Sequence, residues 1–114
     1  MVAYKSPVDC REQARIFKAL GHPTRLFMAV ELGRGERCVC ELQELVGADM
    51  STISKHLSVL REANLVVDER RGSQVFYRLT LPCVLNVLDC IEGVARPRTH
   101  TITAAPLGTA GNRR

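Results

Sequence analysis

Residues 38–60, CVCELQELVGADMSTISKHLSVL, constrain the fold of this chain more strongly than any other stretch. Apolar residues at helical spacing predict a first helix, and they are Val39, Leu42, Leu45 and Val46. Gly47 then ends this helix, because glycine readily adopts the left-handed conformation found just after helices. A second helical pattern starts within a few residues, so the stretch predicts two helices joined by a tight turn.

The second helix of this stretch has an apolar side and a polar side. Asp49 or Ser51 can cap its start. Its apolar stripe consists of Ile53, Leu57 and Leu60. Its exposed side is predicted to carry Ser51, Thr52, Ser54, Lys55 and His56. Two helices joined in this way, the second with a face rich in hydrogen-bond donors, are typical of proteins that insert side chains into the DNA major groove.

A β-hairpin is predicted next, in LVVDERRGSQVFYRL at residues 65–79. Val75, Tyr77 and Leu79 occupy alternate positions, as one face of a strand requires. Gly72 and Ser73 supply a two-residue turn. The tip would carry Arg70, Arg71 and Gln74. On a helix-turn-helix, such a hairpin forms a wing whose basic side chains contact the phosphates beside the groove.

Two helices are predicted before this unit. Asp9 can cap a helix over residues 10–20, which ends at Gly21. One face of this helix holds Cys10, Ala14 and Phe17. Pro23 opens a second helix that runs to about Gly33. Its apolar side is predicted to be Leu26, Phe27 and Val30.

A last helix is predicted from Pro82 to about Ala95, with two apolar stripes. One stripe is Val84, Leu88 and Ile91, and the other is Cys83, Val87, Cys90 and Val94. A helix that is apolar on two sides in so small a domain needs two partners. We therefore expect a homodimer in which this helix contacts both its own core and a second subunit.

The predicted fold class is mainly α with a small β-hairpin, a winged helix-turn-helix of about five helices and a two-stranded wing. Residues 1–8 are expected to be loose, 9–95 to form the DNA-binding and dimerisation domain, and 96–114 to be a disordered basic tail. No apolar run reaches transmembrane length, and the polar N-terminus lacks the apolar core of a secretory signal. We expect a cytoplasmic protein without a membrane partner.

The positive charge of the chain is concentrated at its C-terminal end. The net charge of the 114 residues is +4, from 16 basic and 12 acidic residues. Four of the basic residues and no acidic residue lie in 96–114, so residues 1–95 carry 12 of each sign and sum to zero. The folded part is therefore no general polyanion binder, and its affinity for DNA must come from local clusters of charge.

Five cysteines occur, at positions 10, 38, 40, 83 and 90. Their odd number and the absence of a secretory signal argue against a framework of disulfides, which leaves metal binding, redox chemistry or burial as small apolar side chains. Residues two apart in a regular helix point about 200° from each other, so Cys38 and Cys40 can converge only at a distorted helix start. There, two thiolates would favour a soft ion. The Cys-x-x-Cys spacing of thiol–disulfide enzymes is absent, and we expect no enzyme activity.

ALGHPTRL at residues 19–26 and STISKHLSVLREANLV at 51–66 resemble the ArsR/SmtB family of winged-helix repressors. The resemblance covers roughly residues 10–93. ERCVCEL at 36–42 is similar to the arsenite-sensing branch, in which a further Cys follows three positions after the second; here that position is Gln43. The resemblance implies a homodimer formed by the first and last helices, which binds operator DNA and releases it when an inducer binds. The divalent-metal branch uses an Asp/His cluster on the last helix, which here has Asp89 but no His, so we expect no such zinc site.

We therefore expect a transcriptional repressor that leaves double-stranded operator DNA when arsenite, or another thiophilic metal or metalloid, binds Cys38 and Cys40. A third thiolate would come from Cys83, Cys90 or Cys10, and no other cofactor is required. An alternative keeps the fold but makes oxidation the trigger, through a disulfide between Cys38 or Cys40 and Cys83 or Cys90. A third hypothesis, from another class, is a protein–protein interaction module that uses the wing and the tail without DNA.

Overall fold

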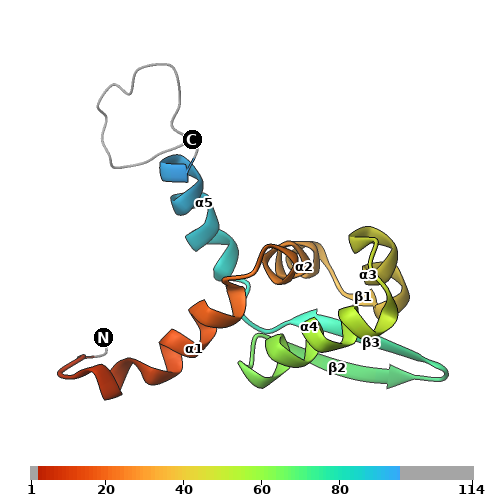
Figure 1. Ribbon diagram of the computed structural model, residues 1–114, viewed down its shortest axis with the longest axis horizontal. Helices are drawn as coiled ribbons and strands as arrows, with labels where there is room; N and C mark the ends of the chain where they lie inside the picture. Colours follow the sequence, from red (N-terminus) through yellow and green to blue (C-terminus); the bar gives the residue numbers. More distant parts are fainter. Residues whose placement is uncertain (1–2, 96–114) are drawn as a thin grey trace. The chain divides into compact units, whose positions relative to one another are not determined.

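The computed structural model describes residues 3–95, and the predicted tail at 96–114 lies outside them. The chain divides into two compact units, Met1–Leu81 and Pro82–Arg114, and each is described here by itself. The elements are η1 (Pro7–Cys10), α1 (Arg11–Leu20), α2 (Pro23–Arg34), β1 (Arg37–Cys38), α3 (Val39–Val46), α4 (Met50–Glu62), β2 (Val66–Arg71), β3 (Gln74–Leu79) and α5 (Val84–Ala95). The described residues are thus mainly helical with a small antiparallel sheet, which confirms the predicted fold class (Figure 1).

The N-terminal residues differ from the prediction in one respect. The 3-10 helix η1 has no counterpart among the predicted elements. Asp9, predicted to cap α1, instead accepts hydrogen bonds from the backbone N–H groups of Lys5 (2.9 Å) and Ser6 (3.2 Å) at the start of η1. Cys10 therefore occupies the N-cap position of α1, and Gly21 follows its last residue as predicted.

The predicted apolar side of α2 is wrong at Phe27 and incomplete, whereas Leu26 and Val30 are half-buried. The buried apolar residues of this helix are Met28, Ala29 and Leu32. Phe27, assigned to the core from its spacing, is 39% exposed. Helix α2 is contacted by α1, α3, α4 and β3, and these neighbours cover a face centred on Met28. Because α2 contains apolar residues on several sides, its sequence pattern alone does not identify the buried one.

The sheet contains a strand that the sequence did not predict. Its order is β1-β3-β2, all antiparallel, so the wing hairpin β2–β3 gains a third strand from the segment just before α3. In β1, Arg37 pairs with Tyr77 and Cys38 pairs with Phe76. A strand of two residues is too short to show an alternating pattern, and only its pairing with β3 defines it.

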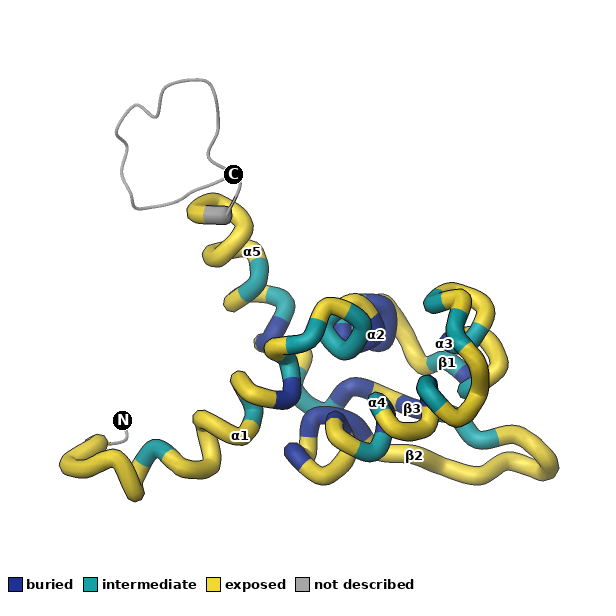
Figure 2. The backbone as a smooth tube through the Cα atoms, viewed as in Figure 1, coloured by how far each residue is buried: buried dark blue, intermediate teal, exposed yellow. Residues whose placement is uncertain are grey.

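The core of the first unit lies where α2, α3 and α4 meet the inner ends of the strands. Predicted core residues Ile53, Leu57 and Leu60 of α4 are all buried, as are Leu42 of α3 and Leu65 before β2. Figure 2 shows this buried interior, and it shows exposed backbone along the outer part of the hairpin. The apolar stripe of α4 is thus held against the other helices, which leaves its opposite side free to face solvent.

The second unit contributes α5. Val87, Ile91 and Val94 are 43%, 49% and 78% exposed, and Cys83 and Cys90 are exposed as well. All four residues of the predicted stripe Cys83, Val87, Cys90 and Val94 are exposed, and in the other stripe Val84 is buried while Ile91 is exposed. Among residues 3–95, no helix is long and apolar enough to span a bilayer.

Two leucines of α3 provide a matched test of this packing. Leu42 is fully buried, whereas Leu45, one turn further along the same helix, is 44% exposed. We expect Leu42→Ala to lower the free energy of unfolding by about 2–5 kcal/mol, because the lost contacts leave a cavity. Leu45→Ala should cost less than about 1 kcal/mol. Urea denaturation of both variants checks this, and equal losses would contradict the assigned orientation of α3.

Candidate functional site

The connection between α3 and α4 is fixed by two residues. Gly47 ends α3 in the left-handed conformation, with φ of 80°. Asp49 then caps α4, because its Oδ1 accepts a hydrogen bond from the backbone N–H of Thr52 (2.9 Å) and another from Oγ of Ser51 (3.2 Å). The hydrogen bonds to Thr52, followed by that to Ser51, lower the pKa of the Asp49 carboxyl. Of the two predicted caps, Asp49 is therefore the one that is used.

The polar face of α4 consists of Ser51, Thr52, Ser54, Lys55 and His56. Ser51, Ser54 and Lys55 are exposed, as the sequence predicts. Thr52 and His56, which are predicted on the same side, are half-exposed. The accessible donors are therefore concentrated in the first turn and a half of α4, the part of a recognition helix that contacts base edges.

His56 is partly covered because it packs against the start of α2. Its ring centroid lies 4.6 Å from that of His22, and its Nδ1 lies 3.5 Å from Nη1 of Arg25. His22 caps α2, since its Nδ1 accepts a hydrogen bond from the backbone N–H of Thr24 (3.1 Å). Burial, then the nearby charges of His22 and Arg25, lower the pKa of His56. The sequence shows His22 only as the residue before a proline, and its contact across 34 positions could not be inferred from spacing.

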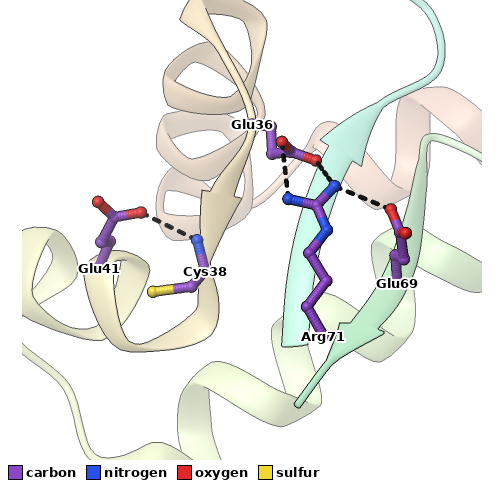
Figure 3. A network of polar contacts seen from close by, with 5 residues as sticks. All are labelled: Glu36, Cys38, Glu41, Glu69 and Arg71. Atoms are coloured by element: carbon purple, nitrogen blue, oxygen red, sulfur yellow. Dashed lines mark hydrogen bonds and ion pairs between the residues drawn. The ribbon is translucent and has the colours of Figure 1, made fainter. Parts of the chain in front are cut away.

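The tip of the wing carries the three predicted polar residues, Arg70, Arg71 and Gln74, and all are exposed. Arg71 is held by two carboxylates: it donates to both oxygens of Glu36 and to Oε1 of Glu69 (2.8 Å), as Figure 3 shows. Its guanidinium also lies over the ring of Phe76, 4.5 Å from the centroid. The hydrogen bonds to Glu36 and then to Glu69 raise the pKa of Arg71. Sequence reasoning missed both carboxylate partners of this arginine.

Cys38 and Cys40 lie in different environments. Cys38 is buried, ends β1 and occupies the N-cap position of α3, where its backbone N–H donates to Oε1 of Glu41 (2.9 Å). Cys40 is in the first turn of α3 and is exposed. Cys10 is half-buried, and all five cysteines are free thiols. Cys38 has the extended conformation usual for an N-cap, so the distorted helix start at which the two thiols would converge is not seen in the described residues.

In the part of the chain that the structure describes, no group of three or more His, Cys, Asp or Glu side chains is placed to hold a metal ion.

Residues 22–67 match the family model described as bacterial regulatory protein, arsR family. The chain is 44% identical over 83 residues to the biofilm growth-associated repressor of Agrobacterium fabrum, a match that covers 73% of this chain and 71% of that protein. It is 44% identical over 69 residues to the repressor of the same name from Xylella fastidiosa, covering 60% of each. It is also 40% identical over 67 residues to the arsenical resistance operon repressor of Escherichia coli, covering 58% of this chain and 57% of that one. The chain thus spans about 60% of the length of the Xylella and Escherichia repressors.

Solved structures resemble the same region. The crystal structure of the transcriptional repressor BigR from Xylella fastidiosa has a TM-score of 0.66 at 39% identity, and it covers 72% of this chain and 87% of that one. The solution structure of the homodimeric winged helix-turn-helix DNA-binding domain Mb0332 from Mycobacterium bovis has a TM-score of 0.71 at 27% identity, covering 90% of this chain and 100% of that one. The arrangement of helices and wing is therefore that of a winged helix-turn-helix domain.

The contact between His22, Arg25 and His56 predicts a stability that depends on pH. Because folding lowers the pKa of His56, the unfolded chain binds more protons below the usual histidine value of about 6.5. The contribution is complete above that pH and is lost as the pH falls through the lowered pKa of the folded state. We expect the midpoint of urea denaturation to fall between about pH 7 and pH 5, and to fall less in His56→Gln. An equal decline in both proteins would contradict this assignment.

Proposed function

This chain belongs to the arsR family of bacterial regulatory proteins, so it is a transcriptional regulator and not an enzyme, and we propose that it is a repressor that binds operator DNA as a homodimer. One observation carries the proposal: α4 has a fully buried apolar stripe and an exposed face of hydrogen-bond donors, and the wing hairpin follows it in the fold. This combination supports insertion of α4 into the major groove with the wing along the adjacent phosphates.

The contacts to DNA that we propose come from two elements. On α4, Ser51, Ser54 and Lys55 are accessible, and Thr52 and His56 lie at the edge of the same face. On the wing, Arg70 and Gln74 are exposed, and Arg70 makes no ion pair with any residue between 3 and 95. Arg71 is a weaker candidate for a phosphate contact, because Glu36 and Glu69 already occupy its donors.

The homodimer is supported by apolar surface that a single chain leaves uncovered. Phe17 of α1 is 62% exposed, and Val87, Ile91 and Val94 of α5 are also exposed. Side chains of this size are rarely left in water on the same helix face without a partner. A two-fold dimer would present two copies of α4 to successive major grooves, as operator recognition requires.

We propose that the inducer is a thiophilic metalloid, arsenite first, held by Cys38 and Cys40. The resemblance of residues 36–42 to the arsenite-sensing branch and the similarity to an arsenical resistance operon repressor support this choice. Both residues supply thiolates, which suit a soft centre. With Gln43 at the position of a further Cys, the third ligand would be an external thiol or one of Cys10, Cys83 and Cys90, the last three from either subunit.

The different burial of the two thiols suggests how binding is coupled to release. Cys38 is 6% exposed whereas Cys40 is exposed, so both can hold one centre only if the junction of β1 and α3 rearranges. Helix α3 packs against α4, and its displacement would misplace the recognition helix in each subunit. An inducer weakens DNA binding when it favours a conformation that binds DNA less tightly, and a displaced α4 would be such a conformation.

A second candidate trigger is oxidation, with the same DNA function. Cys40, Cys83 and Cys90 are exposed free thiols, and several relatives are biofilm growth-associated repressors rather than arsenic repressors. Oxidation would join Cys38 or Cys40 to Cys83 or Cys90 in a disulfide. Substitution of single cysteines distinguishes the two triggers, because each trigger requires different cysteines.

The DNA contacts are tested with single substitutions. Lys55→Ala should weaken operator binding by roughly 1–3 kcal/mol, because a donor at the groove is lost. Arg70→Ala should make the operator-binding constant less dependent on salt. The slope of its logarithm against the logarithm of the salt concentration should fall by about 1 per bound wing, because one phosphate contact no longer releases a counterion. Lys5→Ala, far from α4 in sequence and exposed, is the control. Unchanged affinity in both test variants, measured by fluorescence anisotropy, would remove α4 and the wing from the interface.

The trigger is tested with serine variants of each cysteine. If a metalloid is the inducer, Cys38→Ser and Cys40→Ser should bind operator DNA but fail to release it with arsenite, because a serine oxygen is a poor ligand for a soft centre. Cys10→Ser, Cys83→Ser and Cys90→Ser should at most weaken arsenite binding, without abolishing it. Release of the reduced protein by peroxide, with a disulfide mapped between 38 or 40 and 83 or 90, would instead favour oxidation.

A further inference from the structure

Glu36, which lies just before the thiol segment (residues 38–40), is tied to the wing by a network that the DNA and inducer sites do not account for. Arg71, at the end of β2, donates to both oxygens of Glu36, which directly precedes β1, and to Glu69 on its own strand (Figure 3). Bidentate pairing between a guanidinium and a carboxylate fixes the relative orientation of both groups. This contact joins residues that are 35 positions apart in the sequence.

Three residues of this region lie side by side across the three strands of the sheet. Cys38 of β1 pairs with Phe76 of β3, and Phe76 pairs on its other side with Glu69 of β2. The guanidinium of Arg71 lies over the ring of Phe76 and bonds the carboxylate of Glu69. Strand β1, which ends in a candidate inducer ligand, is thus paired with β3, which in turn pairs with β2, and Arg71 links Glu36 before β1 to the tip of the wing.

We propose that Glu36 and Arg71 are positioning residues that couple the thiol segment directly to the wing, an inference that rests on the proposed function of Cys38 and Cys40. A rearrangement at Cys38 disturbs its pairing with Phe76 and moves Glu36, which is two residues away. Arg71 then loses its fixed partner, and the wing loses the orientation that places its tip beside the phosphates. The signal reaches DNA through the wing as well as through the packing of α3 on α4.

The proposal differs from a phosphate-contact role for Arg71 in what Glu36 should do. If Arg71 served only to bind phosphate, Glu36 would merely compete with DNA for it, and removal of Glu36 would leave the response to inducer intact. If the pair is a coupling element, removal of either partner weakens the response. Glu44, an exposed glutamate of α3, is the matched control for Glu36.

The first measurement needs neither arsenite nor DNA. In reduced protein, the rate of iodoacetamide modification at Cys38 is followed by mass spectrometry for wild type and for Glu36→Ala, Arg71→Ala and Glu44→Ala. Because Cys38 reacts only when β1 opens, we expect about three- to fivefold faster modification in the first two variants, the range that a well-formed ion pair supports. Glu44→Ala should react like the wild type. Unchanged rates in Glu36→Ala and Arg71→Ala overturn the proposal.

The second measurement compares operator affinity with and without arsenite. Wild type and Glu44→Ala should lose at least about tenfold in affinity, whereas Glu36→Ala should lose less than about threefold while still binding arsenite. The same fold loss in all three proteins overturns the proposal. If arsenite fails to release even the wild type, the proposed inducer is wrong, and the modification rates at Cys38 still decide whether the pair holds β1 to the wing.

Discussion

Burial of the apolar stripe of α4 is the interaction on which the rest of this structure depends. Ile53, Leu57 and Leu60 are exposed by 1% or less, and each such side chain contributes about 1.5–3 kcal/mol by leaving water. Since these residues repeat at helical spacing, their burial fixes the rotation of α4 about its axis. The polar face can point outward only because the opposite side is held against α2 and α3. The core residues and the proposed DNA-binding residues therefore lie on opposite sides of one helix.

The parts of the structure that the sequence predicts well are those with a long repeating pattern. The stripe of α4 and the alternation at Val75, Tyr77 and Leu79 both exceed one period, so helix and hairpin follow from them. Strand β1 is two residues long and has no pattern to detect. The buried side of α2 was misassigned because Met28 and Phe27 are both apolar, and only contacts with other elements distinguish them.

In the candidate site, too, residues within local motifs could be predicted from the sequence, whereas contacts between distant segments could not. Lys55 and Arg70 were identified from their place in local motifs, and both are accessible. The pattern of α4 predicts His56 on the exposed side of the helix, but it does not predict the contacts with His22 and Arg25 of α2 that cover part of it. Glu36 and Glu69 had no motif, although they determine the surroundings of Arg71. Contacts between distant segments depend on tertiary packing, which no single window of the sequence contains.

Cys38 belongs to two elements at once, since it ends a strand of two residues and occupies the cap position of the next helix. A strand this short cannot absorb an inserted or deleted residue without a change of pairing. A slip of one position would turn its side chains to the opposite face of the sheet and carry Cys38 out of the core. The segment from Glu36 to Glu41 can therefore diverge in residue type, and hence in the ligand that we propose it binds, while its length stays constant. Inducer preference in such a chain is expected to evolve by substitution and not by insertion or deletion.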